Sequence, residues 1–161
     1  MYPPKLLASN IKESEVSLAV QGPFPVSHLA IFPYGCYVVG PVVPVADFEA
    51  STKEKSVQTR DKLSGLPVWA VPVVDADPAA KTASKAIAVK IASAVEPVIP
   101  APPEQWAALG LPFVPVEFEG LTVTPYVAQQ TGRLAYSVRA TGMRTPPNPA
   151  GRGVARMKDA G

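Results

Sequence analysis

Basic and aromatic side chains lie close together in residues 58–77, which read QTRDKLSGLPVWAVPVVDAD. Arg60 and Lys62 flank the start of a short polar link that ends at Gly65, and Trp69 follows in the next apolar run. Proteins that hold single-stranded nucleic acid need positive charge along the phosphates and flat rings against the bases, each stacked base contributing about 1–3 kcal/mol. The first chemistry that this stretch indicates is therefore nucleic-acid binding.

The same two kinds of side chain occur elsewhere in the chain, in loops and on the polar sides of predicted strands. The candidate nucleic-acid-binding residues are Lys53, Lys55, Arg60, Lys62, Trp69, Lys90, Tyr126, Arg133, Tyr136 and Arg139. Lys90 and Arg139 lie opposite the apolar residues of their strands, so both are expected to point outward. Trp69 and Tyr136 alternate with aliphatic residues, which favours the core over a stacking surface. Acidic residues between the cations dilute the positive charge and predict moderate binding that salt weakens strongly: Glu54, Asp61, Glu117 and Glu119.

Residue types that carry catalysis or metal binding are sparse. The chain holds one histidine, His28, and one cysteine, Cys36, both in apolar surroundings that favour structural roles. Asp75 and Asp77 precede a proline, a pattern that ends a strand and caps a turn more often than it binds a cation. Neither a GxxxxGKS/T nor a GxGxxG phosphate loop occurs. The sequence therefore predicts a protein with no catalytic residue, no metal and no cofactor.

The composition indicates a loop-rich β protein. Twenty of the 161 residues are proline, about twice the usual share, and proline interrupts helices and central strands. Apolar residues make up 47% of the chain, which is enough for a packed core. The formal net charge is +2, and several basic residues gather near the C-terminus. Such tails often touch phosphates or acidic partners, but many are only solvated chain ends.

The sequence disfavours secreted and membrane-bound classes. A single cysteine excludes a disulfide framework within one chain. The chain has no apolar run of about 18 residues, and its first residues lack the apolar core of a signal peptide. We therefore expect a soluble, cytoplasmic protein that has no membrane partner.

Alternation of apolar and polar residues predicts the strands. They are expected over residues 36–39, 42–45, 57–61, 66–75, 86–93, 112–119, 121–127 and 134–140. Gly40 and Pro41 interrupt the first strand, which indicates a bulge or a sharp bend. The polar link 62–65 predicts a hairpin. Pro103 followed by EQWAAL predicts one helical turn that Gly110 ends.

These elements make about five principal strands, with a bent first strand and a helical turn between the third and fourth. That order is typical of the OB-fold, although a generic small barrel or sandwich fits the same pattern. We predict an all-β fold over residues 23–144, a small five-stranded OB-like β-barrel with one short helical insertion. Residues 1–22 are expected to form an N-terminal extension and residues 145–161 a disordered basic tail, so that both termini are flexible and Pro-rich.

A longer stretch around the hairpin indicates a family. Residues 32–81, FPYGCYVVGPVVPVADFEASTKEKSVQTRDKLSGLPVWAVPVVDADPAAK, resemble the actinobacterial plasmid replication, integration and excision activators. The segments LPFVPVEFEGLTVTPYV and RLAYSVRATGMR resemble the second half of that family, so the likeness spans about residues 25–144. The resemblance implies an accessory protein of an integrative conjugative element that switches on replication and excision genes. It carries over no catalytic motif.

Three functions remain open from the sequence. The first is a non-enzymatic DNA-binding protein of a mobile genetic element that prefers single strands and supports replication, excision or transfer. The second is a duplex-DNA-binding transcription activator of replication and excision genes that uses a β-ribbon. The third is a module that docks a replication initiator or recombinase through Pro-rich segments or edge strands. Small single-strand binders often need two or more subunits for a continuous groove, so a homo-oligomer is also open.

Overall fold

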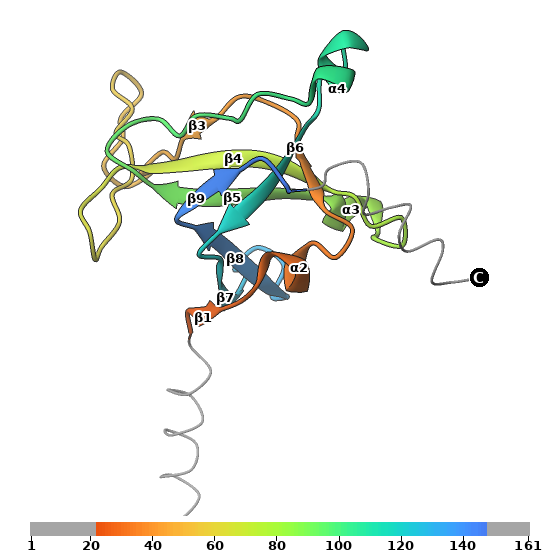
Figure 1. The fold of residues 1–161 in the computed structure, drawn as a ribbon. Coiled ribbons are helices and arrows are strands. Elements are labelled where there is room, and N and C mark those ends of the chain that lie inside the picture. Colours follow the sequence, from red (N-terminus) through yellow and green to blue (C-terminus); the bar gives the residue numbers. More distant parts are fainter. Residues whose placement is uncertain (1–21, 148–161) are drawn as a thin grey trace, which may run out of the picture.

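The computed structural model describes residues 22–147 and shows one curled, mostly antiparallel sheet (Figure 1). The predicted all-β class is confirmed, since residues in strands far outnumber residues in helices. The predicted N-terminal extension, residues 1–22, lies outside the described part except for Gly22. Of the predicted tail, residues 145–161, the structure describes the first three, and Pro146 among them is buried.

Short elements are joined by long connections, as the proline content leads us to expect. The strands are β1 (Phe24–Pro25), β2 (Cys36–Val38), β3 (Val43–Pro44), β4 (Val68–Asp75), β5 (Ala86–Ala92), β6 (Val114–Glu119), β7 (Thr122–Val127), β8 (Leu134–Ala140) and β9 (Gly142–Arg144). The helices are α2 (His28–Ile31), α3 (Thr82–Lys85) and α4 (Glu104–Ala108). Among the described residues, no helix has the length and apolar character needed to cross a membrane.

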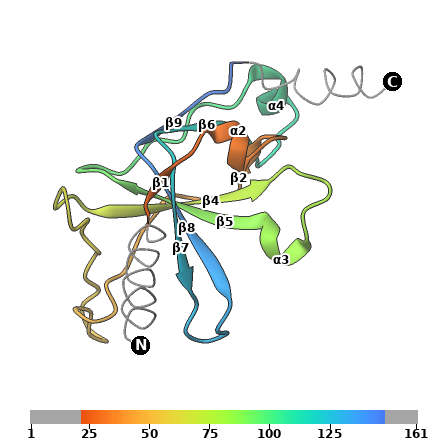
Figure 2. The ribbon, with the colours of Figure 1, turned by 90° about the horizontal axis from the view of Figure 1, so that it is seen from below.

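The strands form one sheet in the order β1-β7-β8-β5-β4-β2-β6-β9, with β3 also on β4. β6 pairs with β2, whereas β7, which follows it after Gly120 and Leu121, pairs with β8. β6 and β7 are one bent stretch of chain, which therefore lies beside β2 at one end of the series β2-β4-β5-β8 and beside β8 at the other end. The β5–β8 pairing is parallel and its neighbours are antiparallel. Figure 2 shows the resulting open half-barrel, in which β7 and β8 cross the direction of β4 and β5.

A bulge between β2 and β3 lets this segment follow β4 around the curve. Val38 lies opposite Val73. Val43 lies opposite Ala70, so five steps along β2 and β3 match three steps along β4. The two extra residues make the bulge that the Gly-Pro pair predicts. Pro72 of β4 lies opposite this bulge, where a central strand tolerates a missing N–H.

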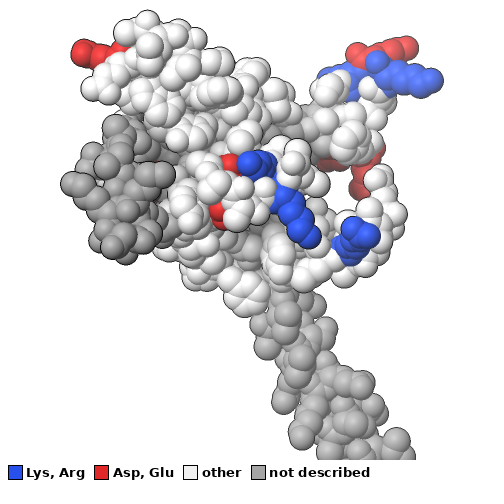
Figure 3. Space-filling model, turned by 90° about the vertical axis from the view of Figure 1, so that its right-hand side faces the viewer, with Lys and Arg blue, Asp and Glu red and all other residues white. Residues whose placement is uncertain are grey.

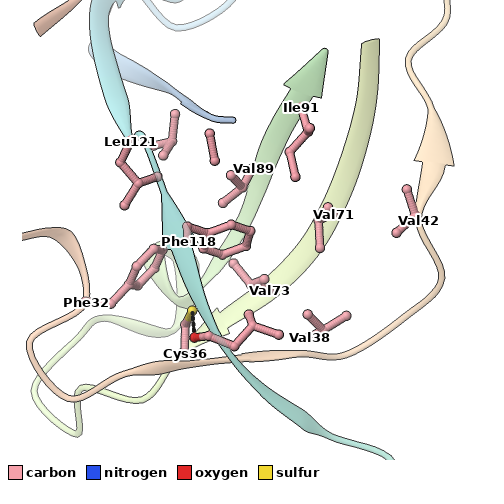
Figure 4. Close-up of a cluster of buried hydrophobic side chains, with 13 residues drawn as sticks. Phe32, Cys36, Val38, Val42, Val71, Val73, Val89, Ile91, Phe118 and Leu121 are labelled. Carbon is pink, nitrogen blue, oxygen red and sulfur yellow. Dashed lines mark hydrogen bonds between the residues drawn. The ribbon is translucent and has the colours of Figure 1, made fainter. Parts of the chain in front are cut away.

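Aliphatic and aromatic side chains from the inner side of the sheet fill the half-barrel (Figure 4). The buried cluster contains Phe32, Cys36, Val38, Val42, Val71, Val73, Val89, Ile91, Val116, Phe118, Leu121, Val138 and Ala140. β-branched residues dominate it, and such residues pack well on a pleated sheet. Cys36 belongs to this core, as predicted. Burial, and then the nearby Asp75, raise the pKa of its thiol to about 12, so the thiol stays protonated at neutral pH.

His28 has the structural role that its apolar surroundings predict. It begins α2 and is buried, and its Nδ1 accepts a hydrogen bond from the Phe118 N–H at 3.1 Å. Its ring centroid lies 5.2 Å from that of Phe32 and 6.2 Å from that of Phe118. This small aromatic cluster joins α2 to β6.

The predicted number of strands is wrong, because residues 22–147 alone form nine rather than about five. Strands β1 and β9 and helix α2 are too short to produce a readable alternation in the sequence. The predicted strand over residues 57–61 is also wrong, since this segment makes two isolated bridges, Ala46 to Gln58 and Arg60 to Pro67. Its polar side chains bond to backbone or to other polar side chains instead of covering the core, so no regular ladder is stabilised there.

Gly120 forms the corner between β6 and β7, where a side chain has no room. Its φ is +59°, and a Cβ at this position would lie 2.8 Å from Thr141 Cγ2. Thr141 is fixed because its N–H donates to Glu119 O at 2.9 Å. We expect Gly120→Ala to lower the free energy of unfolding by more than the roughly 1–2 kcal/mol of left-handed backbone strain alone. Urea denaturation measures the loss.

Gly132→Ala is the matched control for this prediction. Gly132 has a similar φ of +65°, but no atom beyond its two chain neighbours lies within 4 Å of the added Cβ. It should therefore show the backbone strain without the steric clash. Equal losses in the two variants would show that the corner accommodates a methyl group and would contradict the prediction.

Candidate nucleic-acid interface

Two of the predicted cations lie side by side on the side of the sheet that faces away from the core. Lys90 on β5 pairs with Ala70 of β4 and with Arg139 of β8. Paired residues on neighbouring strands point to the same side of a sheet. The preceding residues, Val89 and Val138, pair with each other and are buried. Lys90 and Arg139 therefore point outward, as the alternation predicts.

We call the surface around these cations the outer face. It consists of Ala70, Pro72, Ala88, Lys90, Ser137 and Arg139. Apart from the two cations its side chains are small, so a ligand can approach the backbone of the sheet closely. Neighbouring strands lie about 4.8 Å apart, so Lys90 and Arg139 are near enough to contact the same phosphate or adjacent ones.

Asp61 supplies a negative charge to this pair of cations, which would otherwise repel each other across the strands. Arg139 Nη1 donates to Asp61 Oδ1 at 2.8 Å. Ser64 holds the other carboxyl oxygen, because its N–H and its hydroxyl donate to Asp61 Oδ2 at 2.9 and 2.8 Å. These contacts lower the pKa of the Asp61 carboxyl, the Ser64 N–H having the largest effect and the Arg139 guanidinium a smaller one.

The turn that carries Asp61 closes as the polar link predicts. The Gly65 N–H donates to Asp61 O at 2.8 Å, and the Asp61 N–H donates to Leu66 O at 2.8 Å. Gly65 has a φ of +71°, which favours glycine. Arg60 Nη1 donates to Gly65 O at 2.9 Å, so its guanidinium closes the same turn while it remains exposed.

The lowered pKa of Asp61 predicts a pH dependence of stability. Its ionised form is stabilised in the folded protein, so this contribution is present above the pKa of an unfolded Asp and is lost as pH falls through the lower folded pKa. We expect Asp61→Asn to lower the free energy of unfolding near neutral pH, and to lower it progressively less below about pH 4. Urea denaturation over a pH series tests this. A difference that stays constant with pH would contradict it.

The β7–β8 hairpin places the two predicted tyrosines on opposite sides. Tyr126 pairs with Ala135, on the side that continues the outer face, whereas Tyr136 pairs with Pro125 on the side that continues the core. Both side chains are exposed, Tyr126 by 50% and Tyr136 by 59%. Arg133 is exposed in the turn between the two strands. Tyr126 is therefore the ring that accompanies the outer face.

Trp69 lies on the inner side of β4 and packs against the core. Its indole N–H donates to Ser93 O at 3.0 Å, so its polar atom is bonded within the protein. Trp69 is therefore separated from the outer face, in keeping with the core position that its alternation favours. The remaining candidates are exposed in the segment 45–67, which joins β3 to β4: Lys53, Lys55 and Lys62.

Basic side chains do not form one continuous patch on the face of the molecule that carries α3. Figure 3 shows that Lys and Arg side chains stand there in separate groups, with Asp or Glu beside some of them. Uncharged side chains cover the surface between the groups. A bound polyanion on this face would therefore meet both signs of charge and no continuous basic path.

The carboxylates that could suggest a cation site have other roles. Asp75 Oδ1 accepts the Asp77 N–H at 3.0 Å, and Asp77 Oδ1 accepts the Ala79 N–H at 2.8 Å. Both therefore cap the turn after β4. Within residues 22–147, no three His, Cys, Asp or Glu side chains gather as metal ligands.

Asp61 is the residue of this interface that sequence reasoning missed, having treated it as an acid that dilutes the positive charge. Its bond to Arg139 joins positions 78 residues apart, and no local pattern signals it. The small side chains of the outer face do have a signal in the sequence, because Ala86, Ala88 and Ala92 alternate with β-branched residues around Lys90.

Comparison with protein-family models, curated proteins and solved structures gives no match for this chain. The function is therefore inferred from the geometry of the described residues. The resemblance to the replication and excision activators stays a prediction.

Proposed function

We propose that this protein is a non-enzymatic accessory protein that binds single-stranded DNA on the outer face of β4, β5 and β8. The observation that carries the proposal is the register of Lys90 with Arg139. It sets two outward cations side by side among small residues, where a phosphate backbone can approach. Tyr126 extends the same side along the hairpin and offers an exposed ring for a base.

An OB-like grouping of the strands supports this choice of face. We group β2 with β3 and β6 with β7, since each pair is one bent stretch of chain, and count β4, β5 and β8 singly. On this grouping, β4 and β5 are the second and third strands of a five-stranded barrel. OB-folds bind oligonucleotides on that face and on the loops between strands one and two and strands four and five. Those loops correspond to segment 45–67 and the β7–β8 turn, which carry half of the candidate residues.

Single strands fit this surface better than duplex DNA does. A β-ribbon that enters a groove needs polar side chains that reach base edges. The β7–β8 hairpin has polar side chains in its turn, but its core side exposes Val127, Leu134 and Tyr136, which offer no such contacts. A duplex-binding activator, the second function that the sequence allows, is therefore less well supported.

The resemblance to replication, integration and excision activators suggests where such binding is used. We propose that the protein serves a mobile genetic element by holding single strands that arise during replication, excision or transfer. A replication initiator or a recombinase is then the natural protein partner, since both work where strands separate. Activation of the element's genes is indirect on this proposal.

Fluorescence anisotropy tests the proposal with a labelled single strand of about 30 nucleotides, longer than the 4–16 nucleotides that one OB barrel covers. The matched duplex and a promoter duplex are titrated in parallel at low and moderate salt. We expect the single strand to bind most tightly and its affinity to fall as salt rises. Preference for the promoter duplex would favour the activator instead, and no binding at low salt would contradict both.

A protein-interaction module is the second candidate, because one feature favours it. The core side of the β7–β8 hairpin continues beyond the half-barrel as an apolar surface formed by Val127, Leu134 and Tyr136, exposed by 63%, 61% and 59%. Exposed apolar surface of this kind often marks a protein contact. Failure to bind any DNA, together with recovery of a replication or recombination protein in a pull-down that Leu134→Ser abolishes, would favour this candidate.

A further inference from the structure

We propose that Lys90 and Arg139 form a subsite for a backbone phosphate of the bound strand, and that Asp61 occupies this subsite when no nucleic acid is present. The inference rests on the proposed function and deepens it, because it names the protein group with which the phosphate competes. Asp61 thus acts as a positioning residue that sets the affinity for the strand through Arg139.

The Asp61 carboxylate and the backbone of Arg139 are each held in place independently of the ion pair. Arg139 lies on β8, in register with β5. Asp61 is anchored by the two bonds from Ser64, within a turn that Gly65 closes. The bond of 2.8 Å therefore joins a fixed carboxylate to a guanidinium that extends from a fixed strand. The carboxylate oxygen stands where a phosphate oxygen can accept the same N–H.

The two anions have matching chemistry. Carboxylate and phosphate oxygens both accept charge-assisted hydrogen bonds from a guanidinium group. A guanidinium has five N–H donors, and Asp61 bonds to Nη1 of Arg139. The side chain of Arg139 stays 42% exposed, whereas that of Asp61 is 16% exposed. A strand that approaches from solvent can therefore reach Arg139 while Asp61 is still in place.

Lys90 favours the exchange of the carboxylate for a phosphate. Its ammonium makes no ion pair with another described residue, and it lies beside Arg139 on the outer face. A phosphate that bridges the two side chains meets two positive charges, whereas Asp61 contacts one. The carboxylate next to that phosphate still opposes binding, since like charges repel. Asp61 should therefore weaken binding without abolishing it.

Asp61→Asn tests the proposal by anisotropy with a labelled oligothymidylate of about 30 nucleotides at low salt. We expect binding about two- to fivefold tighter than in the wild type, which is the strength of an exposed ion pair converted to affinity. Glu54→Gln is the matched control. It removes the same charge from the same segment, and Glu54 makes no ion pair with another described residue. It should change the affinity much less.

The double variant Asp61→Asn with Arg139→Gln separates a local effect from a general one. The gain from Asp61→Asn should vanish when Arg139 is absent. A gain that persists there, or that Glu54→Gln reproduces, would show a general charge effect and overturn the proposal. If the wild type binds the strand and Asp61→Asn leaves the affinity unchanged or lowers it, the inference about Asp61 is also overturned. The proposed function stands in that case.

The remaining outcomes distinguish the two claims. Absence of binding by wild type and variant would overturn the proposed function and this inference together, whereas binding by the variant alone would support the inference. Thermal unfolding of every variant is measured first. If Asp61→Asn unfolds below the assay temperature, Asp61→Ser replaces it, since a hydroxyl can still accept the Ser64 N–H.

Discussion

Phe32→Ala is expected to lower the free energy of unfolding by about 3–5 kcal/mol, the range for a buried phenylalanine. The side chain of Phe32 is fully buried, and its ring centroid lies 5.2 Å from that of His28 and 6.2 Å from that of Phe118. Truncation leaves a cavity between α2 and β6 that these rings cannot fill without moving. Against a typical domain stability of about 5–15 kcal/mol, this loss is large. Equilibrium urea denaturation measures it.

Phe48→Ala is the matched control, because it makes the same substitution at a side chain that is 90% exposed in the segment 45–67. Its free energy of unfolding should stay within about 0.5 kcal/mol of the wild type. Similar losses in the two variants would show that Phe32 does not pack in the core, and the half-barrel described for this chain would be wrong.

Replacing both Lys90 and Arg139 by glutamine is expected to weaken single-strand binding by about tenfold to a hundredfold, since each charged hydrogen bond contributes about 1.5–3 kcal/mol and part of that is lost to solvent. Two fewer phosphate contacts should also reduce the slope of log affinity against log salt by about 1.4, at about 0.7 per contact on a single strand. Anisotropy titrations at several salt concentrations give both quantities.

Lys81→Gln with Lys85→Gln removes the same charge from the other end of β5, at α3. This control should lose little affinity, because neither lysine belongs to the outer face. If both double variants weaken binding equally, the strand senses the net charge of the protein and has no defined path over β5 and β8. That result would contradict the proposed interface.

The three long strands that build the outer face could be predicted closely from the sequence. The alternation predicts residues 86–93 and 134–140, and the structure has β5 at Ala86–Ala92 and β8 at Leu134–Ala140. β4 also falls within its predicted range. Half-buried strands alternate clearly because one side meets the core and the other meets water, so both the strand and the outward direction of Lys90 are encoded locally.

Pairing between distant segments accounts for what the sequence did not predict. β1 and β9 have two and three residues, and their strand conformation comes from their neighbours β7 and β6 rather than from any pattern of their own. The bond between Asp61 and Arg139 likewise depends on how segment 45–67 folds back over β8. Local periodicity contains no information on such contacts.

Tyr136 shows that the side of the sheet on which a residue lies can be predicted correctly while its burial is not. Its alternation with Leu134 and Val138 predicts the core side, and its register with Pro125 places it there. Yet the ring is exposed, because the β7–β8 hairpin extends beyond the residues that cover the core. The sequence indicates on which side a residue lies, whereas burial depends on what the rest of the fold places over it.

Mapping the contact surface by NMR tests the central claim most directly. The isotope-labelled protein is titrated with unlabelled oligothymidylate at low salt, and the backbone amide shifts are followed. We predict that the largest changes fall on residues 88–90 and 137–139 and on the Asp61 turn, with smaller ones near Tyr126. Changes confined to the apolar side of the β7–β8 hairpin or to α4, or no change at any residue, would contradict single-strand binding on the outer face.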